Sequence, residues 1–372
     1  MKFKYVMITA ATLLFSFASC GSDETVPEDT GEPKNVTVKI VKPTTYAEEE
    51  TAVGETPVIY DAEVFFIGGG NILKRGSMSD SEAGFPVKQF QDVPAAADEI
   101  IIVGNTGALG SPLLPAASIT TKAELEAVMF EHSAQTHAET DVNLLGSGTI
   151  TGTGDASVNV PVRAAVSRIE ISEIKAKTTG AVLPLVDFKL TGIYINNTYT
   201  KVSLSYADIP TLATDILQYG ANDIAFTDGS YPVRFKDEWT NASVTADDSF
   251  KPANALAKWA YFIMPPVAGK GTTIDSEVHT SVPHIIVKLE DVTTGSGSGN
   301  LGFSPAYLTI TKLIDSSTSS ELTHLEAGKV YKITSLDIDG KDLNPKPETG
   351  ARNVEVTVQV QAWEGVDVDP AL

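Results

Sequence analysis

Hydrophobic and polar residues alternate with a period of two along much of this chain. Residues 36–41 (VTVKIV) are typical, because Val36, Val38 and Ile40 share one side of an extended chain and Thr37 and Lys39 share the other. Alternation of this kind predicts a β-strand with one buried face. The same pattern recurs, more or less cleanly, at residues 158–162, 168–174, 188–195, 284–289, 307–313, 330–338 and 354–360.

Two shorter segments, residues 64–67 and 100–103, are continuously apolar, as expected of strands buried on both faces. Clusters of Gly, Ser, Thr, Asn and Pro separate these segments and supply turns. Many short strands with such punctuation predict an all-β sandwich or barrel architecture.

One helix stands out from this β pattern. Thr121 and Glu124 have the spacing of a capping box, and Leu125, Val128 and Met129 would lie on one face of the helix that follows. We predict that this helix covers one end of an N-terminal sandwich.

The composition supports a large folded protein and excludes some partners. The 372 residues are 42% hydrophobic, enough for a large core, and the length predicts two domains. The formal net charge of −21 repels nucleic acid and acidic lipid headgroups, so a nucleic-acid function is not expected.

The N-terminus has the features of a secretory signal peptide, which we assign to residues 1–19. Lys2 and Lys4 precede an apolar run over residues 5–17, which ends at the small residues Ala18 and Ser19. Loss of the two lysines with this peptide would take the net charge to −23. After it, no stretch approaches the eighteen apolar residues of a membrane span.

Cys20 is the only cysteine, so neither an intrachain disulfide nor a cysteine-rich metal site explains it. Its place directly after the apolar run resembles the lipobox of bacterial lipoproteins, in which the cysteine carries lipid after cleavage. Phe17 departs from that motif, where leucine is commoner. The alternative is an ordinary signal peptide with a cysteine nearby by chance.

Residues 20–35 are rich in acids, Pro and Gly and have almost nothing to bury, so we expect a flexible tether. The pair Asp23 and Glu24 resembles the acidic signal that exports some Gram-negative lipoproteins to the cell surface. A plain solvated linker explains the pair equally well.

No constellation for catalysis, metal binding or cofactor binding is present in the sequence. The glycine-rich stretches at residues 68–70, 146–154 and 295–299 lack the flanking residues of phosphate-binding loops. His132 and His137 are five residues apart, whereas helical metal ligands are usually four apart. We therefore expect no enzymatic activity, no metal and no cofactor.

Four longer segments are distinctive: EIIIVGNTGALG (99–110), VPVRAAVSRIEISEI (160–174), LEAGKVYKITSLDI (325–338) and NVEVTVQVQAW (353–363). They resemble segments of the fimbrillins, the pilin-like lipoproteins of type V pili in anaerobic Gram-negative bacteria. Each is modest alone, but their order and spacing agree with the family over nearly the whole chain. The resemblance implies two tandem transthyretin-like β-sandwich domains, which we place at residues 36–162 and 163–372.

The resemblance also implies assembly by donor-strand exchange, in which a protease removes the first strand and a C-terminal strand of another subunit fills the groove. Val36, Val38 and Ile40 would form the buried face of the removable strand. Val366, Val368 and Leu372 repeat that pattern and form the candidate donor. The alternative is that residues 366–372 are an ordinary edge strand, a place that Pro370 would suit.

Processing is where the sequence departs from the family, whose major subunits are usually cut after an arginine that follows the first strand. No arginine lies between Cys20 and Arg75. Lys42 is the candidate processing residue, although Pro43 would hinder a trypsin-like cut. Either another protease cuts within residues 44–56, or the subunit keeps its strand and its lipid and anchors the pilus.

The sequence thus favours a surface-exposed lipoprotein of the cell outer membrane that forms or anchors an adhesive pilus. Its partners would be other fimbrial subunits, the membrane through its lipid, and a receptor on a host or bacterial surface. The alternative is a non-polymerising lipoprotein adhesin that binds glycan or host protein. Exposed aromatic residues clustered in a groove would favour it, but Trp239, Trp259 and Trp363 are too dispersed in the sequence to show such a cluster, and Tyr and Trp serve equally well in a core.

Overall fold

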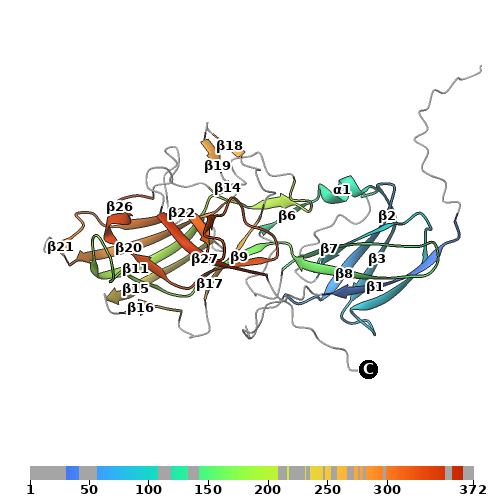
Figure 1. Cartoon of the computed structure of the whole chain (residues 1–372), viewed down its shortest axis with the longest axis horizontal. Helices are drawn as coiled ribbons and strands as arrows, with labels where there is room; N and C mark the ends of the chain where they lie inside the picture. Colours follow the sequence, from blue (N-terminus) through green and yellow to red (C-terminus); the bar gives the residue numbers. More distant parts are fainter. Residues whose placement is uncertain are drawn as a thin grey trace, which may run out of the picture.

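The computed structural model of this chain contains two β-rich bodies that lie one after the other along its long axis (Figure 1). The residues that it describes are 31–41, 57–107, 119–132, 142–207, 216–217, 231, 235–245, 248–252, 258–265, 272–274, 277–279, 282–295, 299–347 and 354–362. Within them the only α-helix is α1 (Lys122–Glu126), so the predicted all-β fold is confirmed.

The first body is a seven-stranded sheet in the order β3-β2-β5-β7-β8-β1-β4. Its strands are β1 (Lys34–Val41), β2 (Asp61–Gly68), β3 (Asn71–Ser79), β4 (Val87–Val93), β5 (Glu99–Gly104), β7 (Leu144–Thr149) and β8 (Ala156–Ala164). The alternating residues of β1 and β8 and the apolar runs of β2 and β5 meet in one hydrophobic core.

The main sheet of the second body runs in the order β15-β11-β20-β22-β27-β24-β9-β17. Its strands are β9 (Ser167–Ile171), β11 (Leu185–Asn196), β15 (Lys236–Thr245), β17 (Trp259–Ile263), β20 (His284–Thr294), β22 (Ala306–Asp315), β24 (Lys329–Ile333) and β27 (Val354–Ala362). The short strands β21 (Gly299–Asn300), β23 (Ser320–Glu321) and β26 (Leu343–Asn344) extend it.

Smaller sheets complete the described part of the chain. They pair β16 (Ser249–Phe250) and β25 (Leu336–Ile338) with β10 (Ile174–Ala176), β12 (Thr198–Tyr199) with β14 (Ile216–Leu217), and β18 (Thr272–Ile274) with β19 (Glu277–His279). A short 3-10 helix, η5, spans Gly340–Asp342.

The two main sheets repeat one topology. Taken in chain order, β9, β11, β15, β17, β20, β22 and β24 occupy the positions that β1, β2, β3, β4, β5, β7 and β8 occupy in the first body. The first strand of each body is parallel to one neighbour and antiparallel to the other. The difference is β27, which separates β22 from β24, whereas β7 pairs directly with β8.

A pair of short strands joins the two bodies. Strand β6 (Met129–Glu131), which follows α1, pairs with β13 (Lys201–Ser203) from the second half of the chain. Phe130 packs edge to face on Tyr206, with ring centroids 6.0 Å apart. The first core accordingly extends to Val202 and Met264, so hydrophobic packing continues across the junction.

Three local predictions need correction. The capping box at Thr121 and Glu124 is present, but the helix ends at Glu126, and Met129 lies in β6 because its backbone pairs with β13. The predicted strand at 168–174 is split into β9 and β10, which belong to different sheets. The predicted strand at 330–338 is likewise split into β24 and β25.

Candidate functional site

The inner face of β1 is built into the first core. Val36 and Val38 are fully buried and Ile40 is 3% exposed, whereas Lys39 is exposed on the opposite face. This arrangement follows from the period-two pattern of the strand. The three residues predicted for a removable strand thus share one buried face.

Strand β1 has a neighbour on each side. It runs parallel to β8 from Val36 to Val41, and antiparallel to β4, with Val38 opposite Lys88. Its counterpart in the second body, β9, differs because all five of its residues are buried. Only β1, of these two equivalent strands, has an exposed residue on its outer face.

Two loops hold the N-terminal end of β1. Lys34 is only 3% exposed, and its Nζ donates hydrogen bonds to the carbonyls of Ala95 (3.2 Å), Ala97 (2.9 Å) and Gly152 (3.2 Å). Beside it, the backbone N–H of Asn35 donates to Asp155 Oδ1 at 3.0 Å. A lysine is rarely buried unless its ammonium is paired, so these contacts fix where β1 begins.

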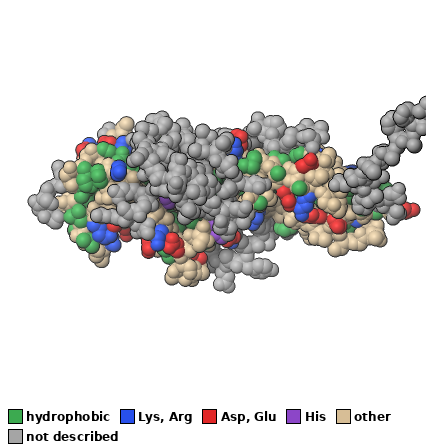
Figure 2. All heavy atoms as spheres, turned by 90° about the horizontal axis from the view of Figure 1, so that it is seen from above, with side chains coloured by type: hydrophobic (Ala, Val, Ile, Leu, Met, Phe, Trp, Pro, Cys, Tyr) green, Lys and Arg blue, Asp and Glu red, His purple; other side chains and the backbone are tan. Residues whose placement is uncertain are grey.

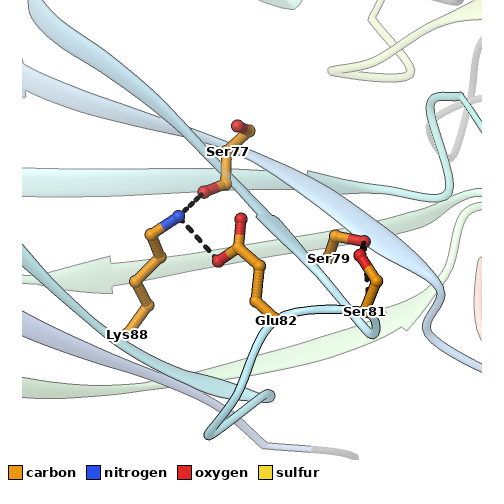
Figure 3. Close-up of polar contacts among 5 residues, drawn as sticks. All are labelled: Ser77, Ser79, Ser81, Glu82 and Lys88. Carbon is orange, nitrogen blue, oxygen red and sulfur yellow. Dashed lines mark hydrogen bonds and ion pairs between the residues drawn. The ribbon is translucent and has the colours of Figure 1, made fainter.

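Strand β4 is an edge strand, and side chains rather than a backbone ladder connect it to β3 in the described structure. Lys88 of β4 donates to the carbonyl of Ser77 at 2.8 Å and pairs with Glu82 at 2.7 Å (Figure 3). Lys74 of β3 donates in the reverse direction, to the carbonyls of Gln91 and Asp92. Within the described residues, the backbone pairing of β4 is therefore with β1 alone.

Side-chain packing also closes this edge. An ideal Cβ on Gly76 would lie 2.4 Å from Phe90 Cε1, so the ring of Phe90 occupies the space that a side chain would need. Phe90 also meets Phe66 edge to face, with ring centroids 5.2 Å apart. The absence of a side chain at Gly76 thus lets the two end strands, β3 and β4, pack together without backbone hydrogen bonds. We call this contact between the end strands of a sheet a seam.

The second body has an equivalent seam between its outermost strands, β15 and β17. Trp239, Phe250 and Trp259 form a cluster there, with ring centroids 5.4 to 5.5 Å apart. Tyr261 donates to Asp237 Oδ2 at 2.7 Å, and burial together with that carboxylate raises its pKa well above the usual value. Trp239 and Trp259 are far apart in the sequence, so the sequence did not predict this contact.

The cluster is part of the core, since Trp259 is 8% exposed and Trp239 and Phe250 pack against the second core. Its contacts are those of a packed seam.

No group of three His, Cys, Asp or Glu side chains within the described ranges could hold a metal ion. His132 is instead a buried core residue, whose Nε2 lies 3.0 Å from the Phe262 carbonyl and whose ring stacks on the Phe235 ring with centroids 3.9 Å apart.

Among the described residues, no helix has both the length and the hydrophobicity of a membrane span.

On the face shown in Figure 2, acidic and basic side chains are interspersed over both bodies. Ion pairs in the described residues include Arg75 with Glu63 (2.9 Å) and Lys122 with Glu99 (2.8 Å).

Several predicted site residues lie outside the described residues. They are the lipid-attachment residue Cys20, the processing residue Lys42, the donor residues Val366, Val368 and Leu372, and also His137 and Trp363. Their roles remain predictions from the sequence.

Comparison with known proteins places this fold. No family model and no curated protein sequence matches the chain. Solved structures do match, among them a fimbrilin from Porphyromonas gingivalis with 11% identity and a TM-score of 0.57, over 90% of this chain and 99% of that one. A candidate cell adhesion protein from Parabacteroides distasonis has 11% identity and a TM-score of 0.57, over 89% of this chain and 99% of that one. Another from Bacteroides eggerthii has 19% identity and a TM-score of 0.52, over 91% of this chain and 98% of that one. This chain therefore has the fold of the fimbrillins.

Proposed function

We propose that this protein is a structural subunit of a fimbrium, without enzymatic activity, that takes part in cell adhesion and assembles by donor-strand exchange. The similarity in fold to a fimbrilin and to candidate adhesion proteins supports the structural role. The predicted division at residues 36–162 and 163–372 belongs to the same proposal, with the first domain widened to residues 34–164 because β1 begins at Lys34 and β8 ends at Ala164.

The observation that carries the exchange mechanism is the setting of β1. A strand with Val36, Val38 and Ile40 buried on one face lies between β8 and β4, and β4 has no other described backbone neighbour. Removal of β1 would open an apolar groove with unpaired backbone groups on both sides, which is a site for strand addition.

The N-terminus supplies the attachment to the cell. A lipid on Cys20 would hold the subunit in the outer membrane at the cell surface, and a tether over residues 20–35 would separate it from the bilayer. Cleavage after β1 would release the lipid together with the strand and give a stalk subunit. A subunit that keeps β1 would keep its lipid and anchor the filament.

The test of the acceptor uses the full chain with an engineered protease site between residues 44 and 56. After the cut, an excess of a labelled peptide of residues 34–41 should exchange into the groove and remain bound on mild-detergent gels. The uncut chain is the control and should take up no peptide. A cut chain that never takes up the peptide would refute the exchange mechanism.

The test of the donor uses filaments sheared from cells. Val368→Asp should remove the subunit from filaments as effectively as deletion of residues 366–372, because a carboxylate without a partner in an apolar groove is costly. Asp367→Asn should leave incorporation unchanged, because the alternation of the sequence would put residue 367 on the face opposite Val368. Normal incorporation of the Val368→Asp subunit would exclude this segment as the donor.

A further inference from the structure

We propose that the groove of β1 selects its occupant by a buried lysine, and that it therefore takes a strand from a different subunit rather than this chain's own C-terminal segment. This inference rests on the strand exchange proposed above. It names the chemistry of the partner: an extended strand with a lysine before its apolar face.

The selecting feature is the set of three carbonyl oxygens, of Ala95, Ala97 and Gly152, which we call the carbonyl cage. All three accept hydrogen bonds from Lys34 Nζ at 2.9 to 3.2 Å. An ammonium group has three N–H donors and no acceptor, so the number of donors matches the number of carbonyls.

The cage is built by two separate loops. Residues 95 and 97 lie between β4 and β5, and Gly152 lies between β7 and β8. Gly152 has a φ of +90°, a conformation that glycine adopts at little cost, so its identity suits the turn that presents its carbonyl. The N–H of Ala97 donates to the carbonyl of Pro94, and the N–H of Ile150 donates to the carbonyl of Asp98, so backbone hydrogen bonds also hold the first loop and join it to the second.

Lys34 belongs to the buried face of the strand. The inner positions of β1 read Lys34, Val36, Val38 and Ile40, all at most 3% exposed. An occupant without an ammonium at the first position would leave the buried carbonyl of Ala97 and the partly buried carbonyls of Ala95 and Gly152 without this donor. Sites that are built to bond a polar group reject ligands that lack it, because the site's own polar groups are then left without partners.

This chain's own tail fails that requirement. If Val366 and Val368 take the places of Val36 and Val38, the residue two positions before Val366 is Glu364. A carboxylate accepts hydrogen bonds and cannot donate when ionised, so Glu364 would meet the cage with the wrong charge. The segment would thus be disfavoured in a copy of its own groove and would serve a groove of another kind.

Peptide competition tests the lysine directly. In the full chain, cut between residues 44 and 56, the Lys34→Met version of the 34–41 peptide should compete about 10- to 100-fold less well than the natural peptide, since bonds to charged groups are strong. The Lys39→Met version should compete as well as the natural peptide, because Lys39 is exposed on the same strand.

Self-assembly of the cut full chain tests the partner. The natural chain should stay monomeric on mild-detergent gels, whereas Glu364→Lys should form ladders and Asp367→Lys, on the other face, should not. Equal competition by the Lys34→Met peptide, or ladders from the natural chain, would overturn the lysine requirement. Failure of the natural 34–41 peptide to bind would instead refute the exchange mechanism itself.

Discussion

The ring centroids of Trp239 and Trp259 lie 5.5 Å apart, with an angle of 68° between the ring planes. Their strands nevertheless stand at opposite ends of the main sheet of the second body. The contact brings β15 against β17 where the described structure has no backbone ladder between them. Edge-to-face aromatic pairs of this kind add stability beyond the apolar area that they bury.

Replacing Trp259 should therefore destabilise the protein strongly. Trp259→Ala should lower the free energy of unfolding by about 3–5 kcal/mol, since it removes a large buried ring from a packed seam. The measurement is urea unfolding followed by circular dichroism. Val182→Ala, at a site that is 72% exposed, is the control and should change stability little. Similar stabilities of the two variants would show that the ring cluster does not close the seam.

The seam of the first body depends on the absence of a side chain. Gly76→Ala would place a Cβ against the ring of Phe90, and neither strand could yield without disturbing the packing between β3 and β4. We expect a loss of about 1–3 kcal/mol in thermal or urea unfolding. Gly154→Ala is a matched control, because a Cβ there would meet no atom within 4 Å. An unchanged Gly76→Ala protein would mean that Phe90 can move freely.

Asp339 makes the stability of the second body dependent on pH. Burial favours the neutral acid, but N–H groups of Val182, Leu183 and Lys341 bond the carboxylate and hold its pKa below the usual value. A carboxylate whose pKa is lowered by folding stabilises the fold at a pH above its unfolded pKa of 3.8. That stabilisation is lost as the pH falls through the pKa of the folded state.

We accordingly expect Asp339→Asn to be less stable than the natural protein by about 1–3 kcal/mol at pH 7, because one partly buried N–H would lose its charged acceptor. The difference should shrink as the pH falls below about 4, since only the natural protein then loses a carboxylate. Urea unfolding at several pH values measures this. A difference that stays constant with pH would contradict the role given to the carboxylate.

Lipid attachment can be tested at Cys20. Cells expressing Cys20→Ala should incorporate no palmitate analogue into this protein, because the thiol is the only one in the chain. The natural protein is the positive control. Equal labelling of both proteins would favour the ordinary signal peptide.

The periodic pattern alone identified most of the strands that carry the two cores. Residues 36–41 became β1 and residues 354–360 became β27, because a period of two with one apolar face leaves few other ways to bury valine and isoleucine. The pattern failed at 168–174 and 330–338, where the chain passes from one sheet to another. Continuation of an apolar pattern does not reveal a change of partner.

What the sequence determined by itself is which residues face inward in strands such as β1 and β8, since that depends on neighbours two positions apart. Tertiary structure decided which strands are neighbours, because pairing joins residues far apart in the chain. Lys34 was predicted to belong to the flexible tether of residues 20–35, which was wrong, because the loops at residues 95–97 and 152 bind its ammonium and β1 begins at this residue. Trp239 and Trp259 are likewise in contact only because the two end strands of the sheet pack together. The residues around each tryptophan do not indicate that contact.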